Sequence, residues 1–122
     1  MSIQCFEKHL SEPWFSWIKN GIKTVIGRPN CGEIKNILPG DTIIWFNDDC
    51  GPGSRRYIKT RVIYFKEYKN FKEMLDKEKL GDIASVNFVK TKKKALEIIN
   101  KCYTKRIINN YGVLSIKVKV VG

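Results

Sequence analysis

The chain passes from helix to strand within one short stretch, Gly21-Ile22-Lys23-Thr24-Val25-Ile26-Gly27-Arg28. Before this stretch, Ser11 offers a hydroxyl that could cap a helix, and the aromatic residues that follow are spaced as on one helical face. Asn20-Gly21 then forms a stop signal. Three β-branched residues at positions 24–26 predict a strand over residues 23–27. We therefore expect a short helix that leads directly into a strand bracketed by Lys23 and Arg28.

The rest of the sequence predicts four further strands and two further helices. The strands cover residues 3–10, 42–46, 55–65 and 111–120. The second of these is apolar enough to be buried on both faces, and the third contains an irregularity typical of a bulge. The helices begin after Asn70 and Thr91, with an irregular stretch between them. Because few strand–helix–strand crossovers are implied, we expect an α+β protein, a small mixed β-barrel with short peripheral helices, formed by residues 1–122 as a single domain.

The charge balance is the strongest global signal. Lysine and arginine number 23 against 12 acidic residues, which gives a net charge of +11 and an isoelectric point near 9.6. Nucleic acid is the leading partner, because each neutralised phosphate releases condensed counterions. An acidic membrane surface is the rival partner, but the sequence contains no long basic amphipathic helix and no lipidation signal. A strongly AT-biased genome would also enrich Lys, Ile and Asn, so the basicity has an incidental explanation as well.

The cysteines and acidic residues suggest no metal centre. Four cysteines are spread along the chain without a Cys-x-x-Cys or Cys/His pair: Cys5, Cys31, Cys50 and Cys102. This spacing predicts free thiols and excludes an ordinary zinc site. Asp48 and Asp49 are adjacent carboxylates, but no third ligand stands in a supporting pattern. We expect no metal and no cofactor. The absence of a signal peptide or a membrane-spanning apolar run favours a reducing compartment, the cytoplasm, with the nucleus as the alternative.

Several blocks occur in an order that is typical of one family. They are the helix with Trp14-Phe15, the block Gly21-x-Lys23-Thr24-Val25-x-Gly27-Arg28, the segment Leu38-Pro39-Gly40-Asp41-Thr42-Ile43 and the late strand Tyr111-Gly112-Val113-Leu114-Ser115-Ile116. Together they resemble the ASCH domain, and the resemblance covers nearly the whole chain, from about His9 to Val121. ASCH domains belong to the PUA-like superfamily of small β-barrels associated with RNA. The resemblance therefore implies a PUA-like barrel with RNA or a nucleotide as its ligand.

The resemblance implies less about catalysis. The family includes an acetylcytidine amidohydrolase and a proposed ribonuclease, and many members have no assigned activity. In the amidohydrolase-like pattern the Lys is followed three positions later by a catalytic hydroxyl, often Thr, and other members carry Glu there. This chain has Ile26 at that position, which supplies no proton, lone pair or charge. Thr24 follows Lys23 directly, and adjacent side chains of a strand point to opposite faces, so Thr24 does not replace the missing group.

We therefore expect a binding module that holds RNA or a modified nucleotide in a basic cleft. The candidate nucleic-acid-binding residues are Lys23, Arg28, Asn47, Trp14, Arg55 and Arg56. The cations would meet phosphates, the indole would stack on a base and the amide would read a base edge. Each has a structural alternative. Arg28 could pair with Glu12, Glu33 or Asp41 to brace the barrel. Trp14 could belong to the core, Asn47 could form a turn, and the surface arginines could be a solvated face.

The competing hypothesis is a hydrolase that acts on RNA or on a modified pyrimidine nucleoside. Lys23 would activate water, and Tyr111 or His9 would assist proton transfer. His9 is the only histidine, and no sequence pattern places it in a triad. The aliphatic residue at position 26 favours the binding module over this enzyme. A third hypothesis is a regulatory domain that binds a protein partner and whose basicity is incidental.

Overall fold

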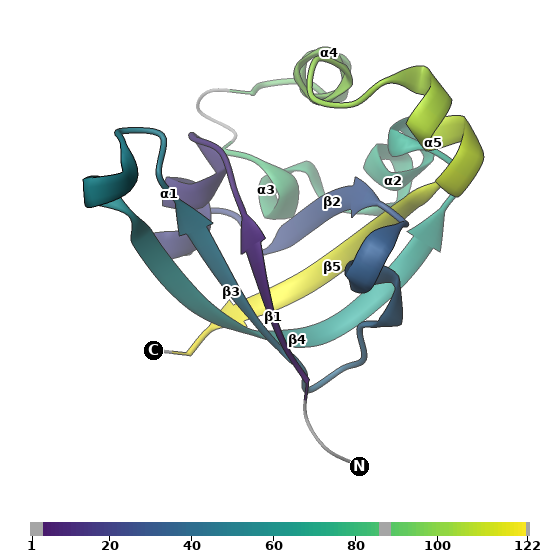
Figure 1. Cartoon of the computed structure of the whole chain (residues 1–122). Coiled ribbons are helices and arrows are strands. Elements are labelled where there is room, and N and C mark those ends of the chain that lie inside the picture. The colour runs from purple at the N-terminus through teal and green to yellow at the C-terminus, as the bar shows by residue number, and fades with distance from the viewer. Residues whose placement is uncertain (1–3, 86–88, 122) are drawn as a thin grey trace.

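The computed structural model describes residues 4–85 and 89–121. Within them, five strands form one sheet in the order β1-β3-β4-β5-β2. The strands are β1 (Cys5–His9), β2 (Val25–Pro29), β3 (Thr42–Asn47), β4 (Arg56–Tyr68) and β5 (Val113–Val120). The β1–β3 pair is parallel, and the other neighbouring pairs are antiparallel. Figure 1 shows this sheet curled into a half-barrel, with the α-helices gathered across its open side.

Five α-helices and two 3-10 turns connect the strands in the described residues. The helices are α1 (Trp14–Lys19), α2 (Phe71–Lys77), α3 (Leu80–Ile83), α4 (Lys92–Asn100) and α5 (Lys105–Tyr111). The 3-10 turns are η1 (Gly32–Asn36) and η2 (Pro52–Ser54). No helix in the part of the chain that the structure describes is long and apolar enough to cross a membrane.

The long strand β4 allows the sheet to curl. Its first half pairs with β3, and most of its length pairs with β5. The β4–β5 register shifts between Val62 and Tyr64, at a bulge that bends the strand and increases its twist. The curled sheet encloses one hydrophobic core, which contains Phe15, Trp45 and Ile116. A second core lies between β2, β5 and helices α2, α3, α4 and α5.

Glu78 ties the C-terminal end of α2 to the sheet. This carboxylate is buried, and it accepts hydrogen bonds from the hydroxyls of Tyr64 and Tyr68 at 3.3 Å each and of Ser115 at 3.1 Å. Burial, followed by the negative charge of Glu78, raises the pKa of Tyr68 to about 12. Because α2 carries Met74, this anchor also fixes one wall of the pocket described below.

The fold class predicted from the sequence, a small mixed PUA-like barrel with short peripheral helices, is confirmed. The predicted strands are present, although residue 3 lies outside the described residues. Asn70 and Thr91 cap their helices by accepting hydrogen bonds from the backbone N–H groups of Glu73 and Lys94. Gly21 has a φ of +75°, the left-handed conformation in which a helix ends readily at glycine.

Four local predictions were wrong. The α1 helix begins after Pro13 without a side-chain cap, and Glu12 rather than Ser11 accepts hydrogen bonds at this end, from the N–H and hydroxyl of Ser16. The strand predicted over 42–46, now β3, is not buried on both faces. It buries only alternate residues, because the helices cover one face of the sheet (Figure 1). The stretch 79–89 contains α3, and α5 lies directly before β5, so that Tyr111 ends a helix instead of opening a strand. α3 is a single turn, and α5 buries only Ile108, so neither helix shows a clear apolar period.

Candidate ligand-binding pocket

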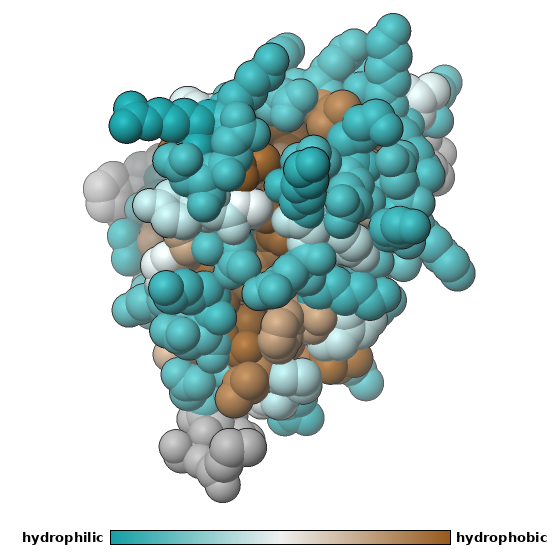
Figure 2. Space-filling view, turned by 90° about the vertical axis from the view of Figure 1, so that its right-hand side faces the viewer, coloured by the Kyte–Doolittle hydropathy of each residue, from teal (hydrophilic) through white to brown (hydrophobic). Residues whose placement is uncertain are grey.

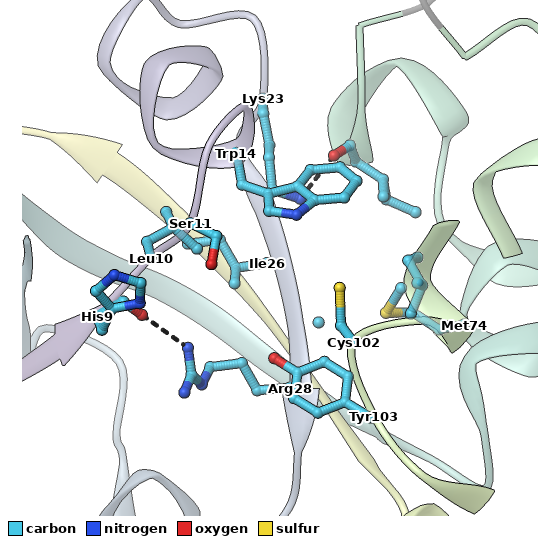
Figure 3. Close-up of a pocket in the computed structure, with 13 residues that line it drawn as sticks. His9, Leu10, Ser11, Trp14, Lys23, Ile26, Arg28, Met74, Cys102 and Tyr103 are labelled. Atoms are coloured by element: carbon cyan, nitrogen blue, oxygen red, sulfur yellow. Dashed lines mark hydrogen bonds between the residues drawn. The ribbon is translucent and has the colours of Figure 1, made fainter. Parts of the chain in front are cut away.

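A pocket of about 330 Å³ opens between the sheet and the helices that cross its open side. Its walls come from the β1–α1 junction, from residues 23–28 around β2, and from helices α2, α3 and α4 with the residues after α4 (Figure 3). The lining residues are His9, Leu10, Ser11, Trp14, Lys23, Ile26, Gly27, Arg28, Met74, Ile83, Ile99, Cys102 and Tyr103. The segment 21–28 thus contributes four residues to the wall: Lys23, Ile26, Gly27 and Arg28.

Lys23 is the buried cation of this wall. Its side chain is 5% exposed, and its ammonium donates hydrogen bonds to the carbonyl oxygens of Val25 at 2.5 Å and Ile83 at 2.6 Å. Burial lowers the pKa of Lys23 to about 7, because the charged form loses its hydration. An ammonium has three donors, so two carbonyl partners leave one N–H for a ligand. Small changes near neutral pH therefore change the charge of the pocket.

Trp14 packs against Lys23 in the wall of the pocket. The ammonium lies 5.2 Å from the centroid of the indole ring, within cation–π distance. The ring is held edge-to-face against Trp17, with centroids 5.1 Å apart and an interplanar angle of 85°. Trp14 itself is half-buried and lines the pocket (Figure 3). Trp14, a binding candidate from the sequence, thus lies in the pocket wall, and its role in binding stays a prediction.

Arg28 is the second cation of the pocket, and its guanidinium makes few contacts with other described residues. One N–H donates to the carbonyl oxygen of His9 at 3.2 Å, and the guanidinium carbon lies 5.8 Å from the centroid of the Trp45 ring. The acidic partners considered from the sequence are engaged elsewhere: Glu12 pairs with Arg56, Glu33 pairs with Lys8, and Asp41 accepts backbone N–H groups. Among residues 4–85 and 89–121, no carboxylate forms an ion pair with Arg28.

The interior surface between these cations is apolar. Ile26 is 2% exposed and lines the pocket at the position where the amidohydrolase-like pattern carries a hydroxyl. Thr24 does not line the pocket. Gly27 makes room for Met74, since a Cβ at this position would lie 2.7 Å from the Met74 Sδ atom. The glycine therefore allows α2 to approach β2 closely.

The wall opposite Trp14 was not found by sequence reasoning. It is formed by Tyr103 and Cys102, which follow α4 (Figure 3). The Tyr103 ring stacks on Phe71, with centroids 5.6 Å apart and planes inclined by 18°. Burial raises the pKa of Tyr103, so its hydroxyl stays protonated and can donate. In the sequence this tyrosine stands in no recognisable motif, and only the packing of α2 against α4 brings it to the pocket.

His9 lines the pocket, but its ring is directed to the loop after β3. Its Nε2 lies 3.2 Å from Asp49 Oδ1 and 3.6 Å from Asp48 Oδ1. The sequence showed no third metal ligand beside these two aspartates, but the fold brings His9 to them. The potential ligand atoms of the three residues lie within 4.8 Å of one another. One oxygen of Asp48 and one of Asp49 are already used by Arg55 and Asn47. Tyr111, the other candidate for proton transfer, is 53% exposed and does not line the pocket.

Asn47, Arg55 and Arg56 lie outside the pocket and brace the β3–β4 connection. Asn47 is 1% exposed, and its amide bonds to the carbonyl of Leu10, to both the backbone N–H and the carboxylate of Asp49, and to Arg56. Arg55 pairs with Asp48 at 3.1 Å, and Arg56 pairs with Glu12 at 3.0 Å. The structure therefore brings together Lys23, Arg28 and Trp14 among the six predicted binding residues. All four cysteines are free thiols, as expected.

A curled five-stranded sheet with short helices across its open side defines the class, a PUA-like barrel. The family model of the ASCH domain matches residues 9–121, so the chain belongs to the ASCH domain family. The crystal structure of hypothetical protein PH0355 superposes with a TM-score of 0.81 at 28% identity, covering 97% of this chain and 100% of that one. The solution structure of protein PF0455 from Pyrococcus furiosus gives 0.71 at 27% identity, covering 97% and 98%. Proteins with curated descriptions give no match.

Proposed function

We propose that this protein binds single-stranded RNA and takes one unpaired nucleotide, ordinary or modified, into the pocket. The base would lie between Trp14 and Tyr103, and its phosphate would meet Arg28. The observation that supports this most directly is the guanidinium of Arg28, which lines an aromatic pocket without an acidic partner in the described residues. The chain's net charge of +11 and the RNA association of ASCH and PUA-like domains point in the same direction.

The shape of the pocket favours an unpaired nucleotide over a duplex. Two aromatic side chains face an apolar interior, and the polar groups Ser11, Lys23 and Arg28 lie around it. A flat base suits such a site, because stacking is worth about 1–3 kcal/mol per base and a hydroxyl or ammonium can read its edge. In a duplex the same base faces would be covered by their neighbours. Single-stranded RNA should therefore bind more tightly than the same sequence in duplex form.

The test is a fluorescence-anisotropy titration of labelled single-stranded RNA over a range of salt concentrations. Arg28→Gln should weaken binding and make the slope of log affinity against log salt shallower by about 0.7, since one phosphate contact is lost. Arg61→Gln removes an equal charge from an exposed residue that does not line the pocket, and it should leave the slope unchanged. An affinity that does not depend on salt, or a duplex that binds more tightly, would contradict the proposal.

A hydrolase acting on RNA or on a modified pyrimidine nucleoside is the second candidate function. One observation favours it: the lowered pKa of Lys23, about 7, gives this amine a neutral fraction that could accept a proton from water. Ile26 opposes it, because the hydroxyl position of the amidohydrolase-like pattern is aliphatic. Deacetylation of acetylcytidine, or cleavage of RNA, by the wild-type protein but not by Lys23→Met would establish the enzyme. Binding without turnover would exclude it for these substrates.

A further inference from the structure

We propose that a second cavity, between α2, α4 and α5, holds the nucleotide next to the one in the pocket, so that the RNA strand passes across Tyr103. This inference rests on the proposed function and extends it from one nucleotide to two. The two cavities are called here the first and the second pocket.

The second pocket is comparable in size to the first, at about 350 Å³. Tyr103 lines both cavities. Its stacking partner Phe71 lines the second pocket and also lies against Gly27, a residue of the first. The stacked pair of Tyr103 and Phe71 is therefore a partition with one cavity on each side. In the proposed arrangement, a ligand longer than one nucleotide would cross the edge of this partition at Tyr103, the residue that lines both cavities.

The residues around the second pocket suit a nucleotide. The side-chain amides of three residues, Asn70, Asn100 and Asn109, lie around an apolar floor that includes Leu96 and Ile108. An amide offers a donor and an acceptor together, as the edge of a base requires. Neither Asn100 nor Asn109 uses its side-chain amide in a hydrogen bond to any described residue.

The charge around the second pocket suits a polyanion. Two lysines line this pocket, Lys72, which pairs with Asp76 at 3.3 Å, and Lys105. The segment 90–106, which contains α4 and the start of α5, carries seven basic residues and a single acidic one, Glu97, which pairs with Lys94. Lys105 lines the pocket, and no ion pair within residues 4–85 and 89–121 engages it. Figure 2, turned to this side of the molecule, shows long hydrophilic side chains crowded on its upper part with hydrophobic residues visible between them. Arg55 and Arg56, by contrast, are neutralised by acidic neighbours.

The experiment compares oligouridylates of one, two, three and six nucleotides as competitors of a labelled RNA, with matched variants. Wild-type protein should bind the dinucleotide about tenfold more tightly than the mononucleotide, because a second base gains its own contacts. Asn100→Ala/Lys105→Ala should lose this gain and keep the mononucleotide affinity. The control is Asn36→Ala/Lys119→Ala, which makes the same changes at exposed residues that line neither pocket, and it should keep the gain.

Amide signals in NMR spectra provide a second readout. The side-chain amides of Asn100 and Asn109 should shift with the dinucleotide and stay in place with the mononucleotide. If the mononucleotide binds and the gain with length is absent, or survives in the Asn100→Ala/Lys105→Ala variant, the second subsite is refuted and the first pocket stands. If no oligonucleotide of any length binds, the proposed function fails and this inference fails with it. Displacement of the dinucleotide from the second pocket by an acidic peptide at equal concentration would refute its assignment to a nucleotide.

Discussion

The ammonium of Lys23 lies 5.2 Å from the centroid of the Trp14 ring, and both residues line the first pocket, so that a ligand there would meet the indole and the cation together. The two residues are linked through the turn after α1, where the backbone N–H groups of Ile22 and Lys23 both donate to the carbonyl of Trp17. This turn sets the lysine under the first aromatic residue of the helix. The local sequence thus produces a stacking surface with a cation beside it.

Replacement of Trp14 by alanine should reduce the affinity for single-stranded RNA by about tenfold or more, because a stacking contact worth about 1–3 kcal/mol is lost. Trp14→Phe keeps an aromatic face and should retain most of the affinity. Anisotropy titration measures both variants, and circular dichroism checks that each is folded. Equal affinities for Trp14→Ala and wild type would show that this ring does not contact the ligand.

The stability of the protein should depend on pH through Lys23. The pKa of this lysine is about 7 in the folded protein and near 10.5 in the unfolded chain, so between these values the unfolded chain binds more protons. Raising the pH from about 7 towards 10.5 therefore stabilises the folded state. Lys23→Met lacks this dependence. The comparison uses the free energy of unfolding of the variant minus that of wild type. This difference should be about 2–3 kcal/mol more positive at pH 6 than at pH 9.

Urea unfolding at several pH values measures this difference. The comparison uses the change with pH rather than the absolute stability, since the methionine also removes two hydrogen bonds to carbonyl groups. A difference between the two proteins that is constant from pH 6 to pH 9 would mean that the lysine keeps its ordinary pKa.

Binding should show the opposite dependence on pH. An anionic ligand near Lys23 favours its protonated form, and this form becomes scarce in the free protein above pH 7. Affinity for RNA should fall by up to about tenfold per pH unit between pH 7 and pH 9. The profile of Lys23→Met should be flatter over the same range. If both proteins gave the same profile, another group would be responsible and Lys23 would not sense the ligand.

The sequence was informative where local chemistry decides the structure. The helix stop at Gly21, the caps at Asn70 and Thr91 and the bulged long strand each depend on residues within a few positions of one another. The predicted barrel followed from the order of these elements. The helix α3 was missed because its four residues form about one turn, and α5 was missed because it buries only Ile108 and so has no apolar stripe.

The pocket was predictable only in part, for a physical reason. Lys23, Arg28 and Trp14 belong to one local segment and reach the pocket together. Tyr103 enters it through tertiary packing, which no local pattern records. The same limit applied to the surface charges. The ion pairs of Arg55 with Asp48 and of Arg56 with Glu12 form only when the β3–β4 connection folds against the start of α1. Because the sequence does not show these pairs, both arginines were predicted to bind the ligand.

Asn47 should act on stability more than on the ligand directly. Its amide makes four hydrogen bonds that hold Leu10, Asp49 and Arg56 together. Asn47→Ala would leave these groups without their partner, and we expect a loss of about 3 kcal/mol in the free energy of unfolding. Chemical denaturation measures the loss. At a temperature where the variant remains folded, its RNA affinity should stay within a few-fold of wild type. A large loss of affinity in a fully folded variant would instead support direct contact between this amide and a base.

Gly27 should prove necessary for an open first pocket. A Cβ at this position would lie 2.7 Å from Sδ and 2.9 Å from Cε of Met74, a fully buried side chain that lines the cavity. In Gly27→Ala the end of this methionine must move, at a cost of about 1–3 kcal/mol in the free energy of unfolding. The cavity is the free space beside it, so RNA affinity should fall as well.

Met74→Val, added to Gly27→Ala, removes the clashing atoms and should restore much of the affinity. Gly53→Ala is the matched control, because a Cβ there meets no atom within 4 Å. Thermal unfolding and anisotropy titration of the four proteins would decide the matter, and a Gly27→Ala variant with unchanged affinity would show that the ligand does not occupy the space beside Met74.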